Sequence, residues 1–173
     1  TGIKGSRDFE SVIANGIVLA EDGKKMAKKL KNYPEPDLIM EKYGADALRY
    51  YLLSSPVMAA ENLNFSESGV KEAFQNVVML LSNILRFYKT YENKSQIQNS
   101  KSQINSKLKV DNILDQWLSA KLNSLIKETT DAMEAYDLPR ATRPIAGFVN
   151  EFSTWWLRRS RDRFKNLGED KEN

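Results

Sequence analysis

Residues 21–36 read EDGKKMAKKLKNYPEP, and the rest of the chain is organised around this stretch. Five lysines and no acid occupy positions 24–31, which we call the lysine loop. Gly23 favours a turn before the run, and Pro34 and Pro36 end it. A cationic run held between a turn and a Pro-x-Pro segment is typical of a loop that attracts phosphate. A solvated surface cluster is the plainer alternative.

The composition restricts the chemistry that this chain can carry. With 41% hydrophobic and 28% charged residues among 173, it is typical of a soluble globular protein. It has no cysteine and no histidine, which excludes disulfides, thiolate nucleophiles, histidine-based triads and ordinary zinc sites. Lysines, carboxylates and hydroxyls remain, so any catalysis would be electrostatic. We expect no metal site in this chain.

The ends and the hydropathy pattern give two further expectations. The first residues lack both a start methionine and an apolar leader, so we expect a piece of a larger chain. No window approaches 18 consecutive apolar residues, so we expect no membrane association.

Positive charge is concentrated in two places. The net charge is only +3, but residues 140–165 carry seven basic side chains and two acidic ones. The remainder, outside this stretch and the lysine loop, is therefore net negative. Two positive patches on an acidic body indicate two places where a polyanion is met.

A small β element is predicted ahead of the lysine loop. Two β-rich runs, Ser11–Ala14 and Ile17–Ala20, flank Asn15-Gly16. Asn-Gly between apolar runs favours a β-hairpin, and a strand that enters a loop is the alternative. Either arrangement delivers the lysine loop from a β element.

Two short helices follow the loop. Pro36 suits the first position of one helix and Gly44 its C-terminal stop, and a second helix ends before Pro56. Residues 58–65 are predicted to be a short connection. Ser66 is then the predicted N-cap of a long amphipathic helix.

The remaining chain predicts two more long helices. Residues 93–110 are polar and repetitive, so we expect a flexible loop there. Asp111 is predicted to cap a helix that runs to about Tyr136, and residues 140–165 form the last helical region, which Pro144 starts or kinks. The fold class is therefore mostly α: an antiparallel helical bundle preceded by a small β and loop piece.

The last helix carries the second cationic cluster, in residues 155–165, which read WWLRRSRDRFK. Arginine suits both bidentate phosphate contact and stacking on bases, so this cluster is a candidate RNA-binding surface. Alternatively, these arginines pair with Glu151, Asp162 and acids on neighbouring helices. The candidate RNA-binding residues are Trp155, Arg158, Arg159, Arg161 and Arg163.

Three segments resemble a known family in the family's own order. Residues 25–29, KMAKK, resemble the Lys-Met-Ser-Lys-Ser loop of the class I aminoacyl-tRNA synthetases, and the continuation LKNYPEP is most similar to the isoleucyl members. Residues 43–53 resemble the segment that leads out of their catalytic domain. Residues 152–164 resemble the end of their helical anticodon-binding domain. The chain departs from the family at Ala27, where serine is usual.

The resemblance implies a division of the chain and a set of roles. Residues 1–56 would end a Rossmann-type catalytic domain, and residues 57–173 would form the anticodon-binding domain. ATP would be the cofactor, with Mg²⁺ in the parent enzyme. Lys25 and Lys28 would be catalytic, and the ATP-binding residues would be Lys25, Met26, Ala27, Lys28 and Lys29.

The resemblance also implies partners and a location. The parent would be a cytoplasmic isoleucine–tRNA ligase, expected to be a monomer, whose partner is tRNA(Ile). Isoleucine would bind only to the upstream part. A chain without histidine cannot contain the family's His-Ile-Gly-His-type element, so we expect the isolated chain to be inactive. A valyl or leucyl fragment and a stand-alone RNA-binding helical module without catalysis are the alternatives.

Overall fold

The computed structural model describes residues 12–92 and 112–166, and it confirms the mostly helical fold class. The flexible loop expected at residues 93–110 and the cap expected at Asp111 lie outside the described residues. In chain order the elements are β1 (Val18–Leu19), a 3-10 helix (Lys28–Leu30), α1 (Pro36–Tyr43), α2 (Ala45–Ser54), a 3-10 helix (Pro56–Ala59), β2 (Leu63–Asn64), α3 (Glu67–Ala73), a π-helical segment (Phe74–Met79), α4 (Leu80–Glu92), α5 (Ile113–Glu134), α6 (Leu138–Asn150), a π-helical segment (Glu151–Leu157) and α7 (Arg158–Asn166).

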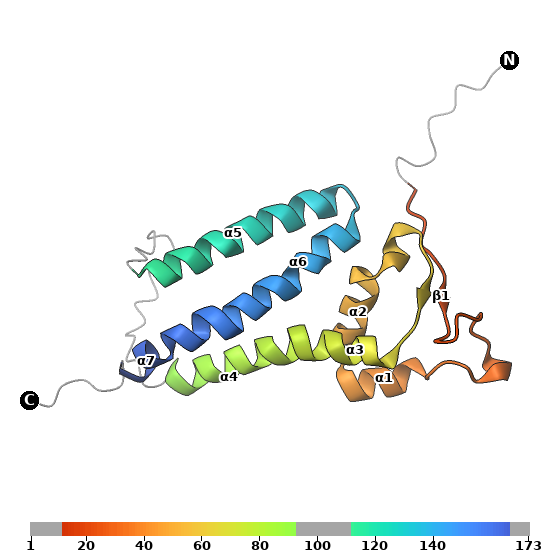
Figure 1. Ribbon diagram of the computed structural model, residues 1–173, viewed down its shortest axis with the longest axis horizontal. Coiled ribbons are helices and arrows are strands. Elements are labelled where there is room, and N and C mark those ends of the chain that lie inside the picture. The colour runs from red at the N-terminus through yellow and green to blue at the C-terminus, as the bar shows by residue number, and fades with distance from the viewer. Residues whose placement is uncertain (1–11, 93–111, 167–173) are drawn as a thin grey trace, which may run out of the picture.

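In the described residues the long helices form a bundle of three helical rods, which can be followed in Figure 1. The first rod is α3 continued by α4, the second is α5, and the third is α6 continued by α7. The third rod packs against α5 on one side and against the first rod on the other. Figure 1 shows that α5 runs antiparallel to both of its companions, while the first and third rods run in the same direction. No helix in the described parts is long and apolar enough to span a bilayer.

The lysine-loop end is joined to the bundle through a small core. Ile39, Tyr43, Ala47 and Val70 are buried there, so α1, α2 and α3 share one apolar interior. The Tyr50 hydroxyl also donates a hydrogen bond of 3.3 Å to the carbonyl of Thr142 on α6. The loop is therefore carried by a platform fixed to the bundle.

The predicted hairpin at Asn15-Gly16 is wrong. Residues 12–17 form no strand, and β1 instead pairs in parallel with β2, so the predicted connection at residues 58–65 contains a strand. Gly16 serves a different purpose: its N–H donates to the carbonyl of Val57 at 2.7 Å, and a Cβ at this position would lie 1.7 Å from the carbonyl oxygen of Glu61. Glycine is needed here because two backbones approach closely.

Most of the predicted helix ends are confirmed. The Ser66 hydroxyl caps α3 by accepting from the Gly69 N–H, and Gly44 ends α1 with φ 84°. Asn112, and not the predicted Asp111, caps α5, and Asp137 caps α6, which therefore starts before residue 140. Pro144 does not start a helix; it lies inside α6.

Candidate functional site

The lysine loop leaves β1 through a tight turn. The Ala20 N–H donates to the carbonyl of Lys24 at 2.8 Å, and Gly23 adopts φ 77°, a conformation that favours glycine. Leu19 and Lys25 then form an isolated antiparallel bridge before the chain enters the 3-10 helix. The loop thus has a defined backbone path.

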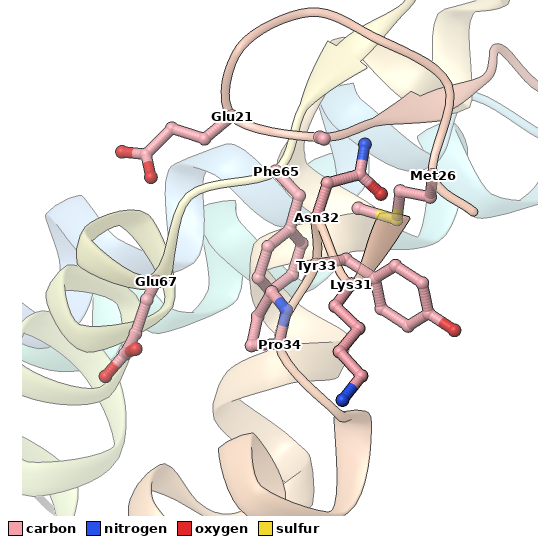
Figure 2. Close-up of a pocket in the computed structure, with 9 residues that line it drawn as sticks. Glu21, Met26, Lys31, Asn32, Tyr33, Pro34, Phe65 and Glu67 are labelled. Carbon is pink, nitrogen blue, oxygen red and sulfur yellow. The ribbon is translucent and has the colours of Figure 1, made fainter. Parts of the chain in front are cut away.

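Two uncharged side chains, Asn32 and Met26, hold the loop in its conformation. Asn32 closes the loop on itself through two hydrogen bonds to the backbone. Its Oδ1 accepts from the Ala27 N–H at 3.0 Å, and its Nδ2 donates to the Lys25 carbonyl at 3.2 Å. Figure 2 shows Met26 extending inward from the loop, toward a cavity of about 300 Å³ that it lines with Asn32 and Tyr33. Met26 also lines a second, apolar cavity of about 320 Å³ beside the α1–α2 core. The residues that line this cavity are Val18, Met26, Tyr33, Pro34, Pro36, Ile39, Leu48, Leu52 and Phe65.

The cations of the loop remain available to an anion. Lys24 pairs with Asp22 at 3.1 Å, and hydrogen bonds from Lys24, first from its backbone N–H, lower the pKa of the Asp22 carboxyl. Lys25, Lys28 and Lys29 are exposed, and no carboxylate in residues 12–92 or 112–166 forms an ion pair with them. Three of the five predicted ATP-binding residues therefore present ammonium groups that are unpaired within the described residues.

The other two predicted ATP-binding residues are placed differently. Met26 is partly buried as an apolar anchor, and Ala27 offers its N–H to Asn32. The prediction assigned no role to Asn32, although the residue lies in the Asn-Tyr-Pro segment that carries the isoleucyl resemblance. Its spacing from the loop gave the only signal: an amide five residues after Ala27 can close a loop by bonding the backbone.

In the arginine cluster, one member holds the helix in place. Arg163 binds the Asp115 carboxylate through both terminal nitrogens, at 2.8 and 2.6 Å, and also donates to the buried Ser160 hydroxyl at 2.8 Å. The Trp156 indole N–H donates to the same carboxylate at 2.8 Å. The hydrogen bonds from Arg163 lower the pKa of Asp115 despite its partial burial. This network ties the start of α5 to α7.

The other predicted members face solvent. Arg158, Arg159 and Arg161 are exposed, and no described carboxylate forms an ion pair with them. Trp155 is 43% exposed, and the Arg159 guanidinium lies 3.7 Å over the centre of its ring. The cluster therefore divides into Arg163, which is bound within the protein, and a solvent-facing set of three arginines and one tryptophan.

The structure does not bring the two cationic clusters together. Figure 1 shows the lysine loop at one end of the longest axis of the molecule and α7 at the other. A single small ligand cannot contact both. The arrangement suits two separate contacts with anions, one at each end of the molecule.

Two family models match the two ends of the chain. Residues 1–64 match the family described as tRNA synthetases class I (I, L, M and V), and residues 115–173 match the anticodon-binding domain of tRNA ligase. The isoleucine–tRNA ligase of Chlamydia trachomatis serovar D is 46% identical over 160 residues, which is 90% of this chain and 15% of that protein. The chain belongs to the isoleucyl branch of the class I tRNA synthetases. The valyl and leucyl alternatives are not favoured.

Other members of this synthetase branch and a solved structure extend the comparison. The cytoplasmic isoleucine–tRNA ligase of Saccharomyces cerevisiae is 40% identical over 166 residues, covering 95% of this chain and 16% of that protein. A ternary complex of Agrobacterium radiobacter LeuRS with tRNA and LeuAMS matches with a TM-score of 0.62 at 21% identity, covering 89% of this chain and 19% of that one. That likeness supports the fold. The chain spans about 15% of the length of the curated relatives it matches.

Proposed function

We propose that this chain is the part of an isoleucine–tRNA ligase that supplies a phosphate-binding loop and a tRNA-binding helical domain. The parent enzyme would activate isoleucine with ATP and transfer it to tRNA(Ile). The observation that carries the proposal is the set of exposed cations on the lysine loop that pair with no carboxylate in the described part of the chain. Asn32 and Met26 hold this loop, in a chain 46% identical to such a ligase.

At the loop, lysine charge would act on the phosphates of ATP. Lys28 would approach them as the amino-acid carboxylate attacks the α-phosphate, with Lys25 and Lys29 alongside. Charge that develops on the transition state and on the departing pyrophosphate would be stabilised electrostatically. Ala27 offers no hydroxyl, so its contribution is the backbone N–H that closes the loop on Asn32.

Magnesium belongs to this proposal as part of the substrate. Mg²⁺ would arrive bound to the phosphates of ATP and offset their charge. Within the described residues, no group of three or more acidic side chains could hold a metal ion. The lysine ammonium groups would supply the positive charge that the chain itself contributes.

At the other end, the exposed side chains of the arginine cluster would contact tRNA. Arg158, Arg159 and Arg161 would meet phosphates or bases, with Trp155 beside them. Arg163 would act indirectly by holding α7 against α5 through Asp115. We also propose a domain boundary near residue 56, a monomeric state and a cytoplasmic location.

The phosphate role is tested in the full-length ligase that contains this chain. Lys28→Ala should lower isoleucine-dependent ATP–pyrophosphate exchange by roughly 10²-fold or more, the size expected when one stabilising group is removed from a transition state. Lys24→Ala is the matched control, because Lys24 already pairs with Asp22. Equal, small losses in both variants would contradict the proposed role of Lys28.

The RNA role is tested in the chain as it stands. Its affinity for tRNA(Ile) should fall steeply with salt concentration, because lysines and arginines that bind phosphates release counterions. The isolated chain should show no ATP–pyrophosphate exchange above background. A salt-independent or undetectable interaction with tRNA would contradict the proposed RNA role.

A further inference from the structure

The Asn15-Gly16 pair docks on the platform just before β1. The Gly16 N–H donates to the carbonyl of Val57 at 2.7 Å, and the Ile17 N–H donates to the side-chain Oδ1 of Asn62 at 3.2 Å. The backbone of residues 16–17 is therefore held by two hydrogen bonds to a segment that lies more than 40 residues later in the chain.

The side chain of Asn15 takes no part in these contacts. It is exposed, and its carboxamide forms no hydrogen bond with any residue in 12–92 or 112–166. Glycine has no side chain to shield its backbone nitrogen, so the Gly16 nitrogen can approach the carboxamide carbon of the residue before it. Two groups that can react with each other are thus held in one chain, which favours an intramolecular reaction.

We propose that Asn15 is a spontaneous deamidation site, which the contact between Gly16 and Val57 protects in the folded protein. The Gly16 nitrogen attacks Cγ of Asn15, so a new N–Cγ bond forms and the Cγ–Nδ2 bond breaks. The amide proton of Gly16 leaves with the departing nitrogen as ammonia, and a cyclic succinimide remains. Water then opens the ring at either carbonyl, which gives aspartate or isoaspartate. The reaction consumes only water and needs no cofactor.

The hydrogen bond to Val57 opposes the first step of this reaction. The Gly16 N–H is directed at the Val57 carbonyl, and attack requires this peptide group to lose its proton and to turn toward the side chain of Asn15. The reaction therefore proceeds from a locally opened state, and its rate follows the population of that state. Loss of the neighbouring bond between Ile17 and Asn62 raises that population.

Formation of isoaspartate detaches this segment from the platform. In isoaspartate the main chain runs through Cβ and Cγ, so the backbone becomes longer just ahead of Gly16. A Cβ at Gly16 would lie 1.7 Å from the carbonyl oxygen of Glu61, so the docked backbone has no room to shift. β1 begins at Val18 and leads into the lysine loop. The modification therefore releases β1 and loosens the lysine loop, whatever anion the loop binds.

The first test compares the same chain in its folded and unfolded states. Both samples are incubated at mildly alkaline pH, one of them in guanidinium chloride, and mass spectrometry of the peptide that contains Asn15 follows deamidation. The folded chain should deamidate at least about tenfold more slowly, because local opening must precede the reaction. Equal rates in the two states would overturn the proposed protection.

A matched pair of substitutions tests whether docking of residues 16–17 provides the protection. Asn62→Ala removes the hydrogen bond to Ile17, whereas Asn64→Ala makes the same change at a side chain that forms no hydrogen bond within the described residues. In the folded chain, Asn62→Ala should speed deamidation of Asn15 about two- to tenfold, the effect of losing one hydrogen bond. Asn64→Ala should leave the rate unchanged. The same rate in both variants would contradict protection by docking.

Limited trypsin digestion tests the consequence for the lysine loop. Wild type that has been aged until isoaspartate accumulates at Asn15 should be cut in the loop several-fold faster than fresh protein. Asn15→Gln, aged in the same way, should be cut as slowly as fresh protein, because glutamine forms the corresponding larger ring far more slowly. If aged and fresh wild type are cut at the same rate, the modification does not release the loop and the inference is wrong.

Discussion

Replacing Asp115 with alanine should loosen the attachment of α7 to α5. The carboxylate accepts two hydrogen bonds from Arg163, at 2.8 and 2.6 Å, and one from the Trp156 indole, at 2.8 Å. Charge-assisted bonds are worth about 1.5–3 kcal/mol when protected from water. The side chains of Arg163 and Asp115 are 37% and 30% exposed, so solvent screening reduces that value toward the exposed-pair limit of about 0–1 kcal/mol. We expect a loss of about 2 kcal/mol for Asp115→Ala and about 1 kcal/mol for Asp115→Asn, which still accepts from Trp156.

Urea unfolding followed by circular dichroism measures these losses. The control is Asp46→Ala, because Asp46 pairs with Arg49 at 2.8 Å but both side chains are highly exposed, at 80% and 71%. That substitution should cost about 0–0.5 kcal/mol. A double-mutant cycle of Asp115→Ala with Arg163→Met should give a coupling energy of about 1 kcal/mol. If Asp115→Ala costs no more than Asp46→Ala, then Arg163 does not fasten α7 and belongs with the arginines that are available to RNA.

Three further predictions follow from the contacts described above. Asn32→Ala removes both hydrogen bonds that close the lysine loop, each worth about 0.5–1.5 kcal/mol. Limited trypsin digestion should then cut the loop several-fold faster. An unchanged cleavage rate would contradict the role of Asn32 in closing the loop. Gly16→Ala should destabilise the fold by about 1–3 kcal/mol in urea because its Cβ would overlap the carbonyl of Glu61, whereas Gly147→Ala, in open space on α6, should stabilise it by about 0.5–1 kcal/mol. The pKa of Asp115 is lowered below its usual 3.8, so the stability that the ionised carboxylate contributes is fully present at neutral pH. That contribution is lost as the pH falls through the lowered pKa. The difference in urea midpoint between wild type and Asp115→Asn should therefore shrink on acidification.

Features with a local signal could be predicted from the sequence. Helix ends at Pro36, Gly44 and Ser66 depend on the conformation or side chain of one residue, and each is found where it was predicted. The same is true of the Gly23 turn that opens the lysine loop. The family was identifiable because three such segments occur in a fixed order along the chain.

Features that depend on distant residues could not be predicted. β2 is only two residues long, and its partner β1 lies 45 residues earlier. Two residues are too few to show the alternating apolar pattern of a strand, so the sequence did not indicate the parallel pair. Without that partner, Asn15-Gly16 resembled a hairpin turn. The close approach of another backbone, which is what requires Gly16, becomes visible only once the fold brings residue 61 alongside. The spacing of apolar residues in the long helices likewise did not indicate which segments would be π-helical.

In the arginine cluster, too, the roles of individual residues depend on distant parts of the chain and could not be predicted from the sequence. Arg159 and Arg163 lie four residues apart on one helix, and sequence spacing alone gave them the same role. Their difference arises from α5, which places Trp117 beside the ring under Arg159 and Asp115 against Arg163. The expected partners for the arginines were Glu151, Asp162 and acids on neighbouring helices. Glu151 pairs with Lys121 instead, while Arg163 does pair with an acid on a neighbouring helix, Asp115 on α5.

The two cationic clusters are anchored by different chemistry. The lysine loop is a short segment held by an amide and a thioether, Asn32 and Met26, so its anchors neutralise none of its cations. The third rod, α6 continued by α7, is held at its α7 end, where an ion pair gives direction as well as attraction, and Arg163 is the arginine used there. An acidic anchor such as Asn32→Asp would place a carboxylate between the loop lysines and reduce their attraction for phosphate. A neutral anchor therefore suits a loop that must meet a nucleotide, while a helix with several arginines can use one of them as its attachment.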